Sequence, residues 1–293
     1  MPHLQEDAHE AGWISTNKTV IRGRMFLRLI SEKVEGMIRF ACWRILQPQI
    51  SVASGAVAMR SDSDWLVANE IFVDRDYDDA LLQAFASREC RHSVRILDLG
   101  ANVGFFSLRC IDLYLQASVQ ADLELVVVEG ATNLVPDLNQ RLARYSDEHA
   151  NIKLIVRGGL VGRRGGKAMF HTSIFNSCTA GVARDNHVSR NRLRANYAEE
   201  CAYFDLDELV QPEAIVDLIK CDIEGSEFDF LENYSDLLRR TRLLAIEFHP
   251  YHCDVSACRK LLDSYGFAQQ RVINNHDTHS LEIYQRTPVE PKG

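Results

Sequence analysis

The chain has 293 residues, of which 46% are hydrophobic and 25% charged, a composition typical of a globular protein and not of a disordered, collagen-like or coiled-coil chain. Its 41 acidic residues outnumber its 33 basic residues, so the protein as a whole repels nucleic acids and anionic membranes. The 8 cysteines form no C-x-x-C motif, which indicates reduced thiols in a cytoplasmic protein. The polar, acidic start and the lack of a long apolar run predict that the chain has neither a secretory signal nor a transmembrane segment.

An amphipathic helix is predicted near the N-terminus. Apolar residues recur every three or four positions over residues 18–46, and Pro48 follows, which indicates a helix that ends before the proline. Basic residues dominate its other faces. We expect residues 1–48 to form a polar tail and this helix, packed on the main domain with its charged face in solvent. Peripheral contact with a membrane surface or docking of a substrate is the alternative.

A small cap and a larger domain are predicted to follow. Residues 49–90 are expected to form the cap, with short strands at Ile50–Met59 and Asp64–Val67 and a helix at Ala80–Ser87. Residues 91–293 alternate apolar, β-rich runs with helical patterns, which predicts an α/β domain with a mainly parallel, doubly wound sheet. The seven predicted strands are Arg95–Leu99, Leu125–Glu129, Lys153–Val156, Val216–Asp222, Leu243–His249, Arg271–Asn274 and Leu281–Gln285, with helices at about 104–116, 132–147, 225–240 and 255–265.

The segment 96–106 is the most informative in the chain. An apolar strand is followed by a tight turn with Gly100 and Gly104 and by the start of a helix, and glycine lets the backbone approach a ligand closely. The dinucleotide pattern G-x-G-x-x-G fails, because Asn102 stands at the second glycine position and Phe105 at the third. The turn therefore does not suit a pyrophosphate.

Acidic residues at the ends of two successive strands favour a nucleoside ligand without phosphates. Asp98 can accept a hydrogen bond from an ammonium group. Glu129 ends the next predicted strand, where a carboxylate can accept hydrogen bonds from both ribose hydroxyls. Each residue alone is weak evidence, but together with the turn they favour S-adenosylmethionine as the ligand.

At this point the chain resembles the FkbM-type S-adenosylmethionine-dependent methyltransferases over roughly residues 50–270. The resemblance implies a Rossmann-like class I methyltransferase fold and methyl transfer to oxygen, commonly on sugar hydroxyls. One departure is Gly130, where the family usually has proline, which leaves the ribose-side loop open. The segments that carry the resemblance are 64–72 (DWLVANEIF), 98–104 (DLGANVG), Glu129, 205–209 (DLDEL), 219–227 (IKCDIEGSE) and 246–249 (IEFH). The cofactor-binding candidates are Asp98, Gly100, Asn102, Gly104, Phe105, Glu129, Asp222 and Glu70.

A second acidic site is predicted at the end of a later strand. Lys220, Asp222 and Glu224 alternate with apolar residues and so are expected to face one side of that strand. We expect Asp222 to face the methionine end of the cofactor across from Asp98, and to hold its amino group or the incoming hydroxyl. Glu224 and Glu227 also suit plain charges at the N-terminus of the following helix.

Glu247 and His249 lie on one side at the end of the next strand. The attacking hydroxyl must lose a proton, and histidine has the side-chain pKa nearest to operating pH. We therefore assign His249 as the base, with Glu224 or Glu247 to orient it or the substrate; a structural, hydrogen-bonded histidine is the alternative. The spacing of these residues is compatible with a magnesium site but does not indicate one, and no metal ligand is assigned. If magnesium were bound, its oxygen and imidazole ligands would come from Asp222, Glu224, Glu247, His249 and His252.

Two polar stretches follow a glycine-rich turn at 158–166 and lie near the mouth of the predicted site. Residues 171–179 are expected to form a simple loop, with recognition of substrate hydroxyls as the alternative. The arginines at 184, 190, 192 and 194 are expected to form a solvated face, with a lid or contact to an anionic substrate as the alternative.

The sequence thus predicts an S-adenosylmethionine-dependent O-methyltransferase that acts on a carbohydrate hydroxyl of a glycan, glycolipid or glycosylated natural product by in-line transfer. RNA 2′-O-methylation is one alternative, but such enzymes typically need lysines around the catalytic aspartate and a basic surface. Lys220 is the only matching lysine, and we expect no nucleic-acid partner. A non-catalytic protein that retains the fold is the other alternative.

Overall fold

The computed structural model describes residues 38, 42, 45–46, 48–52, 55–59, 61–86, 93–173, 176–182 and 197–287. Most of the predicted N-terminal helix and the arginines from 184 to 194 lie outside these ranges. Ile45, from the predicted apolar stripe, is 79% exposed, so the expected packing on the main domain is not seen at this position. Among the described residues, no helix has the length and apolar character needed to cross a membrane.

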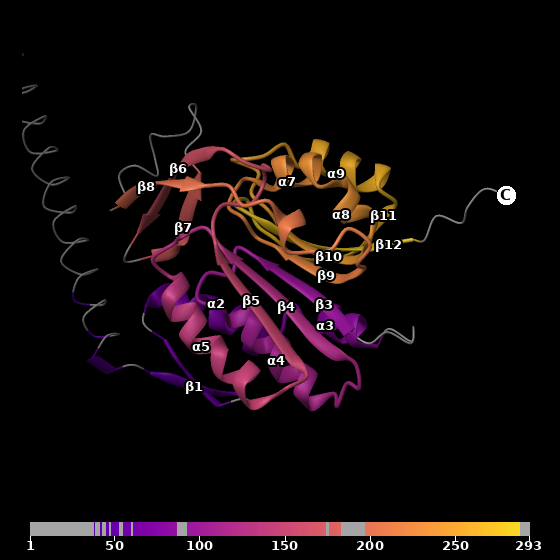
Figure 1. Ribbon diagram of the computed structural model, residues 1–293. Helices are drawn as coiled ribbons and strands as arrows, with labels where there is room; N and C mark the ends of the chain where they lie inside the picture. Colours follow the sequence, from indigo (N-terminus) through magenta and orange to yellow (C-terminus); the bar gives the residue numbers. More distant parts are fainter. Residues whose placement is uncertain are drawn as a thin grey trace, which may run out of the picture.

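A seven-stranded sheet with the order β11-β12-β10-β9-β3-β4-β5 forms the centre of the molecule (Figure 1). The five strands from β10 to β5 run parallel, and the β11–β12 hairpin pairs antiparallel with β10 at one edge. The predicted doubly wound α/β sheet and its seven strands are confirmed. Their bounds are β3 Ser93–Leu99, β4 Asp122–Glu129, β5 Ile152–Gly158, β9 Val216–Cys221, β10 Thr241–Phe248, β11 Phe267–Asn275 and β12 Ser280–Arg286.

Helices cover both faces of the sheet and bury two apolar cores. Successive side chains of a strand point to opposite faces, so Ile96 of β3 enters one core and Leu97 enters the other. Both faces of these strands are buried, and this is why they form nearly continuous apolar runs in the sequence. The first core lies under α3 (Asp78–Phe85), α4 (Phe105–Gln116) and α5 (Val135–Glu148), and the second under α7 (Glu227–Asn233), α8 (Ser235–Arg239) and α9 (Val255–Ser264). The helix predicted over 225–240 is therefore two short helices, which meet at Tyr234.

The predicted strand at Asp64–Val67 is wrong. These residues belong to helix α2 (Asp62–Ala68), which continues into the π-helix η1 (Asn69–Asp74). The hydroxyl of Ser61 accepts a hydrogen bond from the Asp64 N–H at 3.1 Å and donates one to the Asp64 carboxylate at 2.6 Å. Ser61 is thus the N-cap residue of α2, and this cap starts a helix that the short apolar run hides. The strand predicted at Ile50–Met59 is a hairpin of β1 (Gln49–Val52) and β2 (Gly55–Ala58).

A small antiparallel sheet lies beside the end of the main sheet (Figure 1) and has the order β7-β6-β8. It consists of β6 (Lys167–Ser173), β7 (Asn176–Val182) and β8 (Tyr197–Ala202). The expected simple loop over 171–179 is therefore wrong. Residue His171 pairs with both Gly181 and Ala198. Because the paired segments are polar and lie apart in the sequence, they show no alternation of apolar residues that would have indicated strands.

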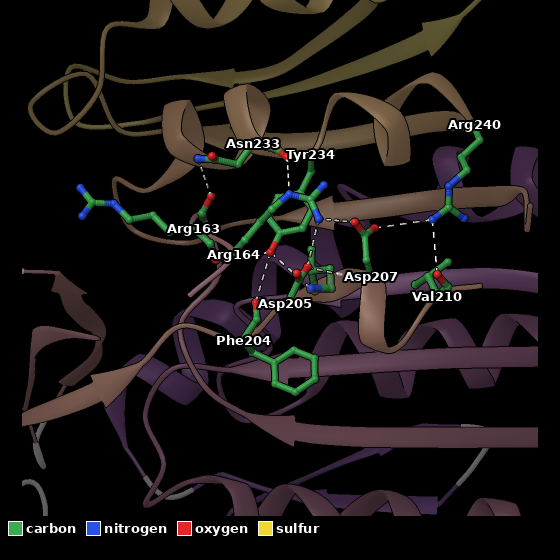
Figure 2. Close-up of polar contacts among 11 residues, drawn as sticks. Arg163, Arg164, Phe204, Asp205, Asp207, Val210, Asn233, Tyr234 and Arg240 are labelled. Atoms are coloured by element: carbon green, nitrogen blue, oxygen red, sulfur yellow. Dashed lines mark hydrogen bonds and ion pairs between the residues drawn. The ribbon is translucent and has the colours of Figure 1, made fainter. Parts of the chain in front are cut away.

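The glycine-rich turn at 158–166 is fixed by Arg164 (Figure 2). Its guanidinium group donates to the carbonyl oxygen of Asn233 at 3.1 Å and pairs with the carboxylates of Asp205, at 3.4 Å, and Asp207. Arg164 thus ties this turn both to the acidic DLDEL motif and to the end of α7, and these residues do not line the cavity described below.

Candidate active site

The strand order reverses between β3 and β9, and a cavity lies at the carboxyl ends of these two strands. Ligands bind at such switch points in doubly wound sheets. The empty volume is about 550 Å³, which includes space open to solvent. The cavity is lined by Gly100, Asn102, Val128, Glu129, Gly130, Gly159, Leu160, Val161, Phe170, Asp222, Ile223, Glu224 and Ser226.

The turn after β3 requires glycine at position 100 and places Glu129 at the cavity wall. Gly100 has a φ of +75°, and a Cβ there would lie 1.7 Å from the carbonyl oxygen of Asp222. The backbone N–H of Asn102 donates to Glu129 Oε2 at 2.6 Å, and that of Ala131 donates to Glu129 Oε1 at 2.7 Å. Each carboxylate oxygen can accept a second hydrogen bond, so Glu129 keeps acceptor capacity for a ligand.

Lys220 lies beneath this turn, between the two aspartates that the sequence singled out. Its Nζ atom donates to the carbonyl oxygen of Gly100 at 2.6 Å and lies 3.5 Å from both Asp98 Oδ1 and Asp222 Oδ2. Asp98 is completely buried, accepts a hydrogen bond from Ser107 at 2.6 Å and is not part of the cavity wall. The ammonium group expected at Asp98 is therefore that of Lys220, whose role the sequence analysis missed.

Five side chains meet at the ends of β9 and β10 and form what we call the acidic cluster: Asp222, Glu224, Glu227, Glu247 and His249. His249 Nδ1 lies 2.9 Å from Glu227 Oε1, and His249 Nε2 lies 3.5 Å from Glu224 Oε2 and 3.8 Å from Glu247 Oε1. The strand alternation expected to continue through Glu224 stops at Cys221, and Glu224 itself has a φ of 52°. The structure brings together the acids and the histidine that the sequence grouped here, and it adds Glu227.

The surroundings of His249 keep its imidazole protonated. Burial lowers the pKa of His249, but the hydrogen bond to Glu227 and the charges of Glu224, Glu227 and Asp222 outweigh burial and raise the pKa to about 11. A base must be unprotonated before it can act. The carboxyl groups around His249 therefore favour its protonated form, and the base role assigned to it from the sequence stays a prediction.

Part of the negative charge of this region is neutralised by protons. Burial, and then the charge of Asp222, raise the pKa of Glu247 to about 8. Burial also raises the pKa of Glu224 well above its ordinary value, although His249 opposes the shift. At the exposed rim on η1, partial desolvation and the charge of Asp222 raise the pKa of Glu70 to about 7. A positively charged ligand would favour the ionised form of these carboxyl groups and so lower their pKa values.

A metal ion is not assigned to this site. One ligand atom from each of Asp222, Glu224 and His249 lies within 4.8 Å of the other two, a spacing that a single ion can bridge. Metal ligation needs a neutral imidazole, so an ion at this site would compete with the proton that the neighbouring carboxyl groups favour on His249.

The predicted cofactor residues divide between the cavity wall and the core. Gly100, Asn102, Glu129 and Asp222 line the cavity, whereas Gly104, Phe105 and Glu70 do not. Phe105 is 1% exposed and packs edge-on against Phe72. Gly104 begins α4 with a φ of 84°, and a Cβ there would lie 2.4 Å from Leu138.

The wall formed by Leu160 and Phe170 was missed, and it packs close to the glycine at position 130. A Cβ on Gly130 would lie 3.1 Å from Leu160 and 3.2 Å from Phe170. Both side chains belong to a third apolar cluster beneath the small sheet. The only signal in the sequence was Gly130 itself, which stands where proline was expected.

The seven-stranded sheet with its antiparallel edge and the cavity at the switch point have the architecture of a class I methyltransferase, an enzyme class that uses S-adenosylmethionine. The chain belongs to the FkbM methyltransferase family, since the model of the methyltransferase FkbM domain matches residues 98–268, which is more than half of the chain.

Solved structures similar to this chain include other methyltransferases. An FkbM methyltransferase from Methylobacillus flagellatus KT is 16% identical, with a TM-score of 0.44, and the match covers 87% of this chain and 60% of that one. The precorrin-6y C5,15-methyltransferase from Geobacter metallireducens GS-15 is 10% identical, with a TM-score of 0.38, and the match covers 71% of this chain and 87% of that one. MNMC2 from Aquifex aeolicus is 15% identical, with a TM-score of 0.39 and coverage of 84% and 73%. No curated protein matches the chain.

Proposed function

We propose that the protein transfers a methyl group from S-adenosylmethionine to a carbohydrate hydroxyl, on a free glycan, a glycolipid or a glycosylated natural product. The observation that carries this proposal is the acidic cluster next to the cavity. Ionised carboxylates accept hydrogen bonds from hydroxyls, and a protonated carboxyl such as that of Glu247 can also donate one. A surface of this kind suits a neutral, polyhydroxylated acceptor.

The cavity residues fit the cofactor. Asp222 Oδ1 and Asn102 Oδ1 are buried oxygen atoms without a hydrogen-bond partner, and a ligand amine or amide would satisfy them. Glu129 is placed to accept from ribose hydroxyls. We assign the methionine ammonium group to Asp222, which lines the cavity, and not to Asp98, which is completely buried outside the lining. When bound, S-adenosylmethionine supplies the methyl group on a positively charged sulfur, which the surrounding carboxylates favour.

The same features argue against RNA as the acceptor. The acidic cluster would repel a phosphate backbone, which such enzymes hold with basic residues. Lys220, the one lysine that matched the pattern of RNA 2′-O-methyltransferases, has a 6% exposed side chain and is paired with two aspartates. It is therefore not free to contact an acceptor.

Methyl transfer from radiolabelled S-adenosylmethionine tests this proposal. The full-length protein is incubated with matched pools of oligosaccharides, alkyl glycosides, glycolipids and RNA, each with magnesium and with a chelator. We expect label in a sugar pool, loss of this label in Asp222→Asn, and no loss in the control Asp236→Asn on α8. Label in RNA alone would contradict the proposal. Binding of S-adenosylhomocysteine without label in any pool would favour a non-catalytic protein.

A further inference from the structure

A second histidine reaches the acidic cluster from the turn between β11 and β12. The backbone N–H of His276 donates to the carbonyl oxygen of His279 at 2.8 Å and closes this turn. A β-bulge interrupts the hairpin between Val272 and Asn274, and bulges of this kind redirect side chains next to active sites. Because β12 pairs with β10, with Leu281 opposite Glu247, the turn lies beside the carboxyl end of β10.

Glu247 stands between two histidines that differ in accessibility. Its Oε1 atom lies 3.8 Å from His249 Nε2 and 4.0 Å from His279 Nε2. The side chain of His249 is 11% exposed, and that of His279 is 30% exposed. His279 can therefore exchange protons with solvent, whereas His249 is enclosed by carboxyl groups.

The groups around His279 keep its imidazole neutral. Burial, followed by the charges of His276 on the same turn and of His249 just after β10, lowers the pKa of His279, and the charge of Asp222 opposes the shift. The pKa of Glu247 is about 8, so its carboxyl group is mostly protonated at neutral pH and carries little charge that would raise the pKa of His279. Thr278 Oγ1 lies 3.0 Å from Nδ1 and can accept a hydrogen bond from Nδ1–H in the tautomer that has its lone pair on Nε2.

We propose that His279 Nε2 takes the proton from the acceptor hydroxyl, while His249 remains a fixed cation within the acidic cluster. This inference rests on the proposed function. The O–H proton moves to Nε2 as the hydroxyl oxygen forms its new bond to the methyl carbon, and the electron pair of the broken carbon–sulfur bond stays with sulfur. The imidazolium then returns the proton to solvent through its exposed edge.

Nuclear magnetic resonance of the full-length protein, labelled with ¹⁵N-histidine, tests the position and charge of His279 without an acceptor. The probes are S-adenosylhomocysteine and sinefungin, which carries a charged amine where the methyl group stands. We expect His279, assigned with His279→Gln, to be neutral at pH 7 and to titrate at lower pH with sinefungin than with S-adenosylhomocysteine. The control His149, at the end of α5, should not respond to the exchange. A protonated His279 at pH 7, or one that does not respond, overturns the inference.

Kinetics with a sugar acceptor from the labelling panel provide the second readout. His279→Gln should lower kcat by about 10²- to 10⁴-fold, the usual contribution of a general base, and leave the affinity for S-adenosylhomocysteine unchanged. It should also abolish the fall in rate toward low pH, which His149→Gln should retain. Wild-type kcat in His279→Gln would overturn the inference alone. Failure of the wild-type protein to bind S-adenosylhomocysteine would instead overturn the proposed function.

Discussion

The ammonium group of Lys220 donates a hydrogen bond to the carbonyl oxygen of Gly100 at 2.6 Å, which joins the end of β9 to the turn that forms the floor of the cavity. The same group lies 3.5 Å from a carboxylate oxygen of Asp98 and from one of Asp222. One buried cation thus holds the backbone turn and balances two acids. The opposing charges and the carbonyl bond compensate the burial of the lysine.

Replacement of Lys220 by methionine should destabilise the protein. The change leaves Asp98 completely buried without its counter-charge, and breaking a buried pair in this way costs about 3–5 kcal/mol. Urea denaturation at pH 7 measures the loss in the free energy of unfolding. The double variant Lys220→Met/Asp98→Asn should recover part of that loss, because it also removes the uncompensated charge. Additive effects of the two changes would contradict the pairing.

Gly100 should tolerate no side chain. In Gly100→Ala, the new Cβ would lie 1.7 Å from the carbonyl oxygen of Asp222, and the φ of +75° adds strain. We expect a loss of about 3 kcal/mol or more in the free energy of unfolding, together with loss of S-adenosylhomocysteine binding. Gly165→Ala is the matched control, because a Cβ at Gly165 has no neighbour within 4 Å. Equal stability of the two variants would show that the turn is built differently.

Glu227 should control the charge of His249. In Glu227→Gln the pKa of His249 should fall from about 11 toward neutrality, as measured by ¹⁵N-histidine titration. The raised pKa means that the folded protein binds this proton more tightly than the unfolded chain. Its contribution to stability is therefore complete below the ordinary pKa of 6.5 and is lost as pH rises toward about 11. At pH 7 we expect Glu227→Gln to lower the free energy of unfolding by about 3 kcal/mol. An unchanged His249 midpoint would contradict this account.

The sequence predicts the parts of the fold that depend on local pattern. The buried strands are apolar runs, and their carboxyl ends meet at one edge of a parallel sheet, so Glu129, Asp222, Glu247 and His249 could be expected near one site. The helix start at Ser61 was also a local signal, but one carried by a polar N-cap residue and not by apolar spacing.

The electrostatics of the site depend on contacts between distant segments and could not be predicted. Asp98 was expected to face a ligand, but the fold gives it Lys220 as a partner. His249 was assigned as a base because of its residue type, yet its protonation depends on Glu227, which approaches from α7. His279 comes from an edge hairpin, and no pattern in the sequence relates it to the acidic cluster.

Calorimetric titration of the full-length protein with S-adenosylhomocysteine tests the central claim most directly. The account predicts one molecule bound per chain and an affinity about 10- to 100-fold weaker in Glu129→Gln, because a charge-assisted hydrogen bond contributes about 1.5–3 kcal/mol. Gly165→Ala, outside the cavity lining, should bind like the wild type. Absence of binding, or an unchanged affinity in a folded Glu129→Gln variant, would contradict the assignment of this cavity as the cofactor site.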